Sequence, residues 1–315
     1  MKTLFLKSGL AIFIFATFLF TIVSCTQTAA TPELEPAAVN NITGTVVDQL
    51  NVPQANVQIQ VGRETTTTSA TGTYSINSGG NADGFVYLTA KKSGFIEGSK
   101  TFRFTTNTTF NVKIMLVNNT VYTTFNTGIE NTVKLPNNTR VKFPRSFVDQ
   151  NNQPYNGTVS VSMHHIFPSN TDKKYIYRGL AVINNGVVTE KKCRLYGMIL
   201  IEMKGSAGQL LDISSTSSLQ ATIVLESSQL TNTPVSLETL DFDDLNGYWR
   251  PRGLATIPQT TTGANIDDER GVTMTTRAND YNFARSNRGR GIAFPGPVEE
   301  DVDPNFDNGI TATKK

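Results

Sequence analysis

The chain has 315 residues, enough for two domains, and only 17% of them are charged, with 28 Lys and Arg against 26 Asp and Glu. This near-neutral balance argues against nucleic acid as a partner, because its binders usually carry a concentrated basic surface. Two His and two Cys leave no room for a His/Cys metal cluster or a disulfide framework. The chain instead holds 43 Thr and 28 Asn. Since Thr favours strands and Asn favours turns, the composition predicts an all-β protein.

The N-terminus has the layout of a secretion signal. Lys2 and Lys7 precede an apolar stretch, residues 10–23, which is shorter than the roughly 20 residues needed to cross a membrane. The stretch runs into Ile22-Val23-Ser24-Cys25, which resembles the bacterial lipobox. The resemblance implies a lipoprotein signal peptide over 1–24, acylation (palmitate) of Cys25, and membrane attachment through the lipid. The alternatives are an ordinary signal peptide with a chance Cys, or an uncleaved anchor.

Residues 25–40 separate this signal from the first strand pattern. They are rich in Ala, Pro, Thr and Glu and show no periodicity, which is typical of a tether. Fully extended, residues 26–40 reach on the order of 50 Å. We therefore expect a flexible, lipid-anchored tether that holds the folded part clear of the bilayer.

Residues 41–117 carry six or seven short strand patterns. The segment 55–61 alternates strictly between polar and apolar residues, the period of a half-buried strand, and Gly, Asn and Pro mark the turns. A small β-sandwich is the predicted fold. The segment resembles the carboxypeptidase regulatory-like domain, a transthyretin-like sandwich of Bacteroidetes-type surface proteins, at Gly44, Val46, Asp48, Pro53, Gly72, Tyr74 and 92–95. The resemblance implies a non-catalytic accessory module, with Tyr74 and Phe95 in its core.

Residues 120–258 repeat the pattern of short strands and turns. Asn-Gly turns at 185–186 and 246–247 lie between apolar alternations and predict hairpins. The segments 196–202 and 242–249 resemble, in outline, a ZU5-type β-sandwich. Some ZU5-related proteins cleave themselves at a Phe-Ser bond near a His. Here Pro168 separates Phe167 from Ser169, so we do not expect self-cleavage.

The remaining candidates for chemistry are few. His164 and His165 are adjacent in a strand pattern, so their side chains should face opposite sides and could not easily share a metal. Cys193 has no second free Cys with which to form a redox-active disulfide, and we interpret it as a residue of an edge strand. We expect structural roles for all three.

Two acidic segments are reminiscent of calcium loops. In 241–247 the Gly comes one position later than in a calcium-binding loop, and no Glu follows to supply the bidentate last ligand. A hairpin turn is therefore favoured. In 301–307 Phe306 occupies the position of the Gly. Trp249, the single Trp, follows the first of these segments. The family resemblance implies a core position for it, and an exposed platform for a sugar ligand is the alternative.

Residues 259–315 are polar, with little periodicity and separate basic and acidic clusters. We expect a largely disordered tail that the second module does not need for folding. Val272, Met274 and Phe283 are the residues that could contradict this by adding one edge strand.

The sequence therefore predicts two tandem β-sandwich domains behind a lipoprotein signal, followed by a loose tail. The predicted role is a non-catalytic, lipid-anchored protein of the cell envelope that acts in surface binding, adhesion or structure, with no metal or cofactor. Family context favours the outer membrane, and envelope proteins or glycans as partners. The alternatives are an accessory subunit of an envelope complex that handles polysaccharide or peptide, and a hydrolase.

Overall fold

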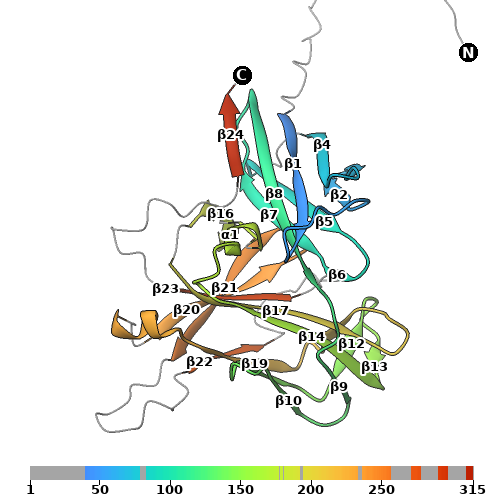
Figure 1. Cartoon of the computed structure of the whole chain (residues 1–315). Coiled ribbons are helices and arrows are strands. Elements are labelled where there is room, and N and C mark those ends of the chain that lie inside the picture. Colours follow the sequence, from blue (N-terminus) through green and yellow to red (C-terminus); the bar gives the residue numbers. More distant parts are fainter. Residues whose placement is uncertain are drawn as a thin grey trace, which may run out of the picture. The chain divides into compact units, whose positions relative to one another are not determined.

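We analysed the protein as a computed structural model that describes residues 40–78, 83–176, 178–179, 181–191, 194–232, 236–256, 271–277, 290–296 and 310–314. The described chain is nearly all β, which confirms the predicted fold class (Figure 1). The exceptions are one helical turn, α1 (Lys173–Ile176), and one 3-10 turn, η1 (Ser227–Asn232). Within these residues no helix has the length and apolar character needed to cross a membrane.

Residues 40–118, the sandwich region, form two facing sheets. One sheet has the order β24-β8-β1-β4, with β6 also on β8, and the other has the order β3-β2-β5-β7. Their bounds are β1 Asn40–Asp48, β2 Gln58–Val61, β3 Glu64–Thr67, β4 Thr73–Ser78, β5 Phe85–Lys91, β6 Phe95–Ile96, β7 Gly98–Arg103, β8 Thr108–Asn118 and β24 Ile310–Lys314. The central strand β1 runs antiparallel to β4 and parallel to β8.

The core of the sandwich region follows from the alternation seen in the sequence. Inward side chains of both sheets, including those of Ile42, Ile59 and Leu88, are fully buried. Tyr74 is buried as well, and its hydroxyl donates to the carbonyl of Val112 at 2.9 Å. Phe95 is only partly buried and packs on the edge of the same cluster.

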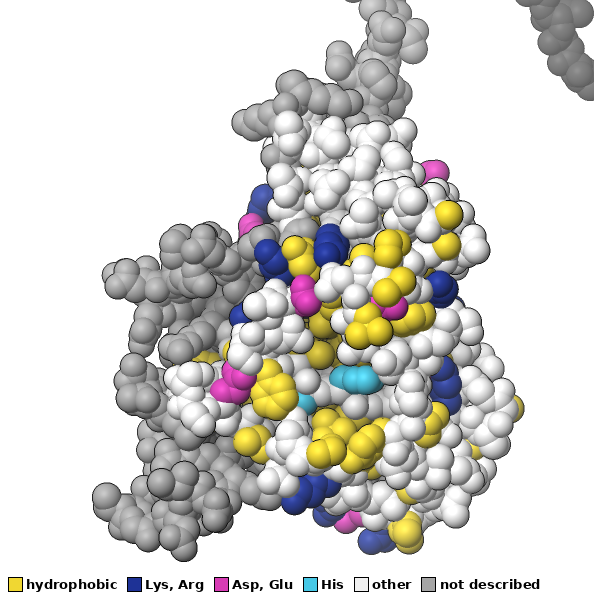
Figure 2. Space-filling view, viewed as in Figure 1, with side chains coloured by type: hydrophobic (Ala, Val, Ile, Leu, Met, Phe, Trp, Pro, Cys, Tyr) yellow, Lys and Arg dark blue, Asp and Glu magenta, His cyan; other side chains and the backbone are white. Residues whose placement is uncertain are grey.

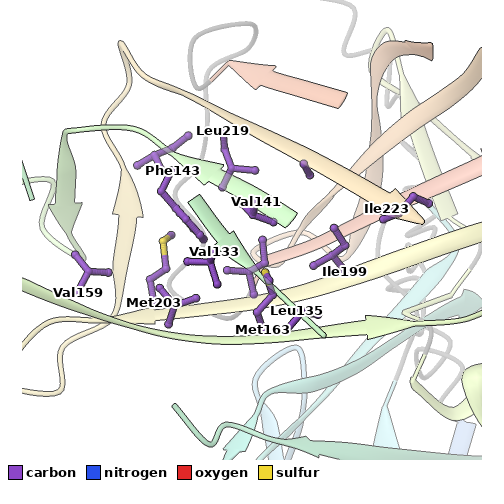
Figure 3. Packing of buried hydrophobic residues seen from close by; sticks show 14 of the residues in the cluster. Val133, Leu135, Val141, Phe143, Val159, Met163, Ile199, Met203, Leu219 and Ile223 are labelled. Carbon is purple, nitrogen blue, oxygen red and sulfur yellow. The ribbon is translucent and has the colours of Figure 1, made fainter. Parts of the chain in front are cut away.

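Strands between residues 123 and 296, the wide-sheet region, build a sheet of twelve strands with the main order β10-β11-β19-β22-β21-β20-β23-β17-β14-β9 and a small sheet of β13-β12-β18. The first bounds are β9 Thr123–Asn126, β10 Asn131–Lys134, β11 Arg140–Phe143, β12 Phe147–Asp149, β13 Pro154–Tyr155, β14 Thr158–Ile166 and β15 Ala181–Asn184. The others are β16 Val187–Glu190, β17 Arg194–Lys204, β18 Leu211–Ile213, β19 Ser218–Val224, β20 Ser236–Asp243, β21 Tyr248–Thr256, β22 Gly271–Arg277 and β23 Arg290–Gly296. Branched and aromatic side chains, among them Val141, Phe143 and Ile199, fill the core beneath the sheet (Figure 3).

The expectation of a largely disordered tail is wrong for three segments of 259–315. β22 pairs with β19 along its whole length, as the apolar residues at 272 and 274 had suggested. β23 lies between β17 and β20, in the interior of the wide sheet, and β24 pairs with β8 of the sandwich region. A strand flanked on both sides satisfies its backbone groups through its neighbours, and these distant pairings leave no mark in its own local sequence. The rest of the tail lies outside the described residues.

A second apolar cluster joins the two regions. Val47, Ile96 and Met115 come from the sandwich region and pack with residues of the wide-sheet region, which are Met198, Leu200, Leu240, Phe242 and Trp249. The described residues accordingly belong to one compact unit.

Candidate functional site

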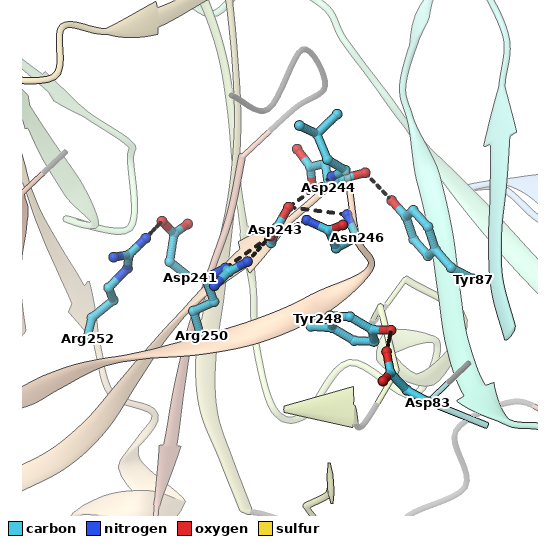
Figure 4. A network of polar contacts seen from close by, with 10 residues as sticks. Asp83, Tyr87, Asp241, Asp243, Asp244, Asn246, Tyr248, Arg250 and Arg252 are labelled. Atoms are coloured by element: carbon cyan, nitrogen blue, oxygen red, sulfur yellow. Dashed lines mark hydrogen bonds and ion pairs between the residues drawn. The ribbon is translucent and has the colours of Figure 1, made fainter. Parts of the chain in front are cut away.

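The acidic segment at 241–247 is the tight turn that joins β20 to β21. Asp243 Oδ1 accepts the backbone N–H groups of Leu245 (3.1 Å) and Asn246 (3.2 Å). Its Oδ2 accepts the Asn246 amide at 2.9 Å and forms an ion pair with Arg250, whose Nε lies 3.0 Å away (Figure 4). Gly247 has a φ of 79°, which suits Gly. The hairpin turn that the Asn-Gly pair predicts is thus built around the carboxylate of Asp243.

The other two carboxylates of this segment also contact arginines. Asp241 Oδ2 lies 3.0 Å from Nη2 of Arg252, and the side chains of both residues are almost completely buried. Asp244 Oδ1 lies 3.2 Å from Nη1 of Arg178, and both side chains are buried. Three carboxylates that each pair with a guanidinium are poor candidates for a cation site, because a calcium site needs oxygen ligands free of competing positive charge.

Arg178 lies where the two regions meet. Besides Asp244, it donates to the hydroxyl of Ser99 at 3.2 Å and to the carbonyl of Glu97 at 3.1 Å, both in the sandwich region. Its guanidinium lies 5.0 Å from the ring centre of Phe242. Buried arginine needs such a set of acceptors, because an unpaired guanidinium in the interior is costly.

Further contacts fasten the hairpin to the sandwich region. The hydroxyl of Tyr87 donates to the carbonyl of Asp244 at 2.7 Å, and the hydroxyl of Thr101 donates to the carbonyl of Gly247. A Cβ on Gly247 would lie 2.3 Å from the ring of Tyr87, so a larger residue does not fit there. Tyr248 reaches across in the same way, with its hydroxyl 2.9 Å from Asp83 Oδ2 (Figure 4).

Trp249 is completely buried in this junction. Its Nε1–H donates to the carbonyl of Gly179 at 3.0 Å, and its ring packs edge-on against Phe242 with centroids 4.9 Å apart. A side chain with no exposed surface cannot stack on a sugar. Trp249 is therefore a core residue, which corrects its candidacy as a ligand contact.

A cavity beside Arg178 measures about 10 Å³. Its lining comes from both regions and consists of Ile96, Glu97, Gly98, Met115, Val117, Ile176, Arg178 and Leu200. This volume holds about one water molecule and no organic ligand.

The two histidines take up the opposite faces that the strand pattern predicted. His164 donates from Nε2 to the carbonyl of Asn118 at 2.8 Å, and burial lowers its pKa. His165 Nδ1 accepts from the Asn137 amide (3.2 Å) and lies 2.8 Å from the Thr139 hydroxyl. Burial lowers the pKa of His165 to about 4. His164 thus contacts the end of β8, and His165 contacts the turn at 137–139.

Other candidates fall outside the described residues: Cys25, Cys193 and the acidic segment 301–307. Within the described residues no group of three or more His, Cys, Asp or Glu side chains is arranged to hold a metal. On the face seen in Figure 2, acidic and basic side chains are interspersed, and no extended patch of one sign appears there.

Comparison with protein-family models gave no match, and comparison with curated proteins gave none. Among solved structures, the Bacillus anthracis TIE protein is 8% identical with a TM-score of 0.22 over 76% of this chain, and the chain covers 44% of that protein. The major pilin subunit BcpA of Bacillus cereus is 9% identical (TM-score 0.22, covering 76% of this chain and 85% of that one). A streptococcal ancillary pilin is 11% identical (TM-score 0.20, covering 72% and 61%). Scores this low carry no argument about function.

Sequence reasoning identified the hairpin but missed the residues that bind it. Arg178 gave no local signal, because it stands in a short irregular segment far from Asp244 along the chain. Tyr87 lies in β5, and its sequence neighbours indicate only a strand. The signal available was indirect: an acidic turn rich in Asp, in a chain with few charges, requires partners of the opposite sign wherever it is buried.

Proposed function

We propose that the protein is a non-catalytic, lipid-anchored component of the bacterial cell envelope whose folded part serves as a binding or structural module. The proposed order is a signal peptide (1–24), a tether from Cys25 to 40, a regulatory-like sandwich (41–117) and a second module (120–258), to which tail strands are added. The outer membrane is the proposed location.

The observation that supports the non-catalytic role is the pairing of the acidic hairpin. A hydrolase of the dispersed-carboxylate type needs two carboxylates that face a space for substrate and titrate near working pH. Here Asp241, Asp243 and Asp244 each pair with an arginine, and the cavity beside Arg178 has room for only one water molecule. The carboxylates of the hairpin therefore stabilise the fold, which supports a non-catalytic role.

Envelope proteins are the favoured partners in this proposal. Glycan-binding sites commonly present exposed aromatic rings, and the single Trp is buried. The large exposed apolar side chains of the described residues are instead mostly aliphatic: Leu50, Val52, Val121, Tyr122, Ile129, Val187, Leu245 and Leu254. Protein surfaces recognise such side chains through shape and apolar contact.

The anchor is tested by replacing Cys25 with Ala and, as a matched control, Cys193 with Ala. We expect the wild type and the Cys193→Ala variant to fractionate with membranes and to incorporate a palmitate analogue. The Cys25→Ala variant should do neither. Incorporation of the label by Cys25→Ala, or its retention in membranes after normal signal removal, would contradict the proposed lipid anchor.

The binding role is tested with the intact protein in its own envelope. Cross-linking followed by capture should recover a defined set of envelope proteins with the wild type and not with the Cys25→Ala variant. Recovery of polysaccharide without protein would favour glycans over envelope proteins as the partners.

A further inference from the structure

Asn-Gly pairs occur in the sequence at 156–157, 185–186, 246–247 and 308–309. In such a pair the main-chain nitrogen of Gly can attack the side-chain amide of Asn, because Gly has no side chain to hinder the approach. The reaction needs a free Gly nitrogen and an Asn side chain that can turn toward it. The pair at 308–309 lies outside the described residues, and the other pairs differ in their surroundings.

The pair at 246–247 is held at both reacting groups. The side-chain amide of Asn246 donates to Asp243 Oδ2 at 2.9 Å, and the N–H of Gly247 donates to the carbonyl of Asp243 at 2.7 Å. Both hydrogen bonds must break before the Gly nitrogen can reach the Asn side chain. This pair is therefore protected by the fold.

The pair at 156–157 is held at one reacting group. The N–H of Gly157 donates to the hydroxyl oxygen of Thr127 at 3.0 Å. The side chain of Asn156 is exposed. We therefore expect this pair to be protected as long as the bond to Thr127 lasts.

The pair at 185–186 lacks both kinds of protection. It forms the whole loop between β15 and β16, since Asn184 is opposite Val187. The φ values of 48° at Asn185 and 79° at Gly186 suit the type I′ turn that Asn-Gly favours. Both residues are exposed, and among the described residues no hydrogen bond engages the Asn185 side chain or the Gly186 N–H.

The hairpin that carries this pair lies at the margin of the wide-sheet region. Of the described strands, β16 pairs with β15 alone, and most of its side chains are exposed. A hairpin of this kind opens locally more easily than strands in the interior of a sheet. Such opening lets Asn185 reach the conformation in which its Cγ meets the nitrogen of Gly186.

We propose that Asn185 is a modification site, at which the folded protein spontaneously converts the asparagine to aspartate and isoaspartate. The nitrogen of Gly186 bonds to Cγ of Asn185, the bond from Cγ to Nδ2 breaks, and ammonia leaves with the proton of the Gly N–H. Water then opens the cyclic imide. Opening at Cγ gives aspartate, and opening at the main-chain carbonyl carbon gives isoaspartate. The proposal rests on no part of the proposed function.

The isoaspartate product changes the hairpin itself. It carries the main chain through the former side chain, which lengthens a loop that holds only Asn185 and Gly186 between the paired strands. The register of β15 with β16 then cannot be kept, and Val188 leaves its place beside Phe85 and Tyr248. We expect β16 to detach from β15 while the core of the sandwich region stays ordered.

The test follows the described pairs in one sample. The full chain in detergent is incubated at physiological temperature in neutral and in mildly alkaline buffer, and is then digested with trypsin under mildly acidic conditions. The pairs fall on separate peptides, because Lys173 and Lys204 lie between them. Mass spectrometry measures the conversion of each Asn. We expect conversion at Asn185 to be several-fold faster than at Asn156 and Asn246, and faster in alkali, because the Gly nitrogen must lose its proton.

Two comparisons separate the effect of the fold from that of the local sequence. In urea the protecting hydrogen bonds are lost, so all these pairs should convert at similar rates. Thr127→Val removes the acceptor of the Gly157 N–H, so it should raise conversion at Asn156 several-fold in the folded protein and leave Asn185 unchanged. The proposal is overturned if Asn246 converts as fast as Asn185 in the folded chain, or if Asn185 stays intact there while the unfolded chain converts.

Hydrogen exchange of the incubated protein tests the consequence for the hairpin. The control is Asn185→Gln, whose side chain is one carbon too long to form the same ring. We expect residues 181–190 to exchange faster in the incubated wild type than in this variant, with no difference in the sandwich region. Equal exchange in the presence of isoaspartate would overturn the proposed detachment of β16.

Discussion

The sandwich region and the wide-sheet region are built from similar strands but are assembled differently. All strands of the sandwich region except β24 come from one continuous segment, residues 40–118, although only β2 and β3 among its paired strands are consecutive in the chain. The wide sheet instead takes β23 from residues 290–296 and places it between β20 and β17, which lie far earlier in the chain. The comparison shows that local patterns identify a region drawn from one continuous segment, and fail where a distant segment completes a sheet.

Truncating the chain is the strongest test of this difference. Ending it after Gln259 removes β22, β23 and β24, leaving β17 and β20 without the strand between them. We expect a loss comparable with the total stability of a domain, about 5–15 kcal/mol, and therefore no cooperative thermal transition. Ending it after Gly296 removes β24 and should lower the melting temperature by only a few degrees. A cooperative transition in the shorter chain would show that β23 is dispensable.

Arg178 tests how the two regions depend on each other. Arg178→Ala removes a buried guanidinium that pairs with Asp244, which should lower the free energy of unfolding by about 3–5 kcal/mol. The matched control is Lys142→Ala, which removes an exposed ion pair with Glu130 inside the wide-sheet region and should change that free energy only slightly. Urea unfolding measures both. Equal effects would mean that the junction adds nothing to stability.

Tyr74 tests the sandwich region by itself. Tyr74→Ala removes a ring from the core and should cost about 3–5 kcal/mol. Tyr74→Phe removes only the hydroxyl that donates to Val112 and should cost about 1 kcal/mol. Burial also raises the pKa of Tyr74, so its phenol should not ionise before the protein unfolds in alkali. Ultraviolet difference spectra at rising pH check this.

His165 gives the smallest effect, confined to the wide-sheet region. Its pKa is about 4 in the folded protein and near 6.5 when unfolded, so between these values the unfolded chain binds a proton that the native chain does not. Stability should therefore fall as pH falls from about 6.5 to 4, by on the order of 2 kcal/mol. His165→Asn should flatten this slope, and His164→Asn should retain most of it. A slope unchanged in His165→Asn would assign the acid sensitivity to other groups.

The sequence predicts well the strands that have one solvent-exposed face and the turns that need a positive φ. The alternation at 55–61 and the Asn-Gly pair at 246–247 report local geometry, because side-chain period and positive φ depend on near neighbours. The strand at 290–296 and the partner of Asp244 could not be predicted in this way. Both depend on which distant segments meet, and no local property of the chain encodes that meeting.

The pairing around Thr109 has one more consequence, for the connectivity of the fold. Asn41, at the start of β1, and Thr313, near the end of β24, both face Thr109, one from each side. Two strand spacings separate them, which is about 10 Å. A short peptide could bridge that distance, so the folded part could be circularly permuted, with new ends cut at the exposed Gly62 turn between β2 and β3. The first and last strands of the folded part thus lie close together, so the position of the chain ends could change while the strand pairing stayed the same.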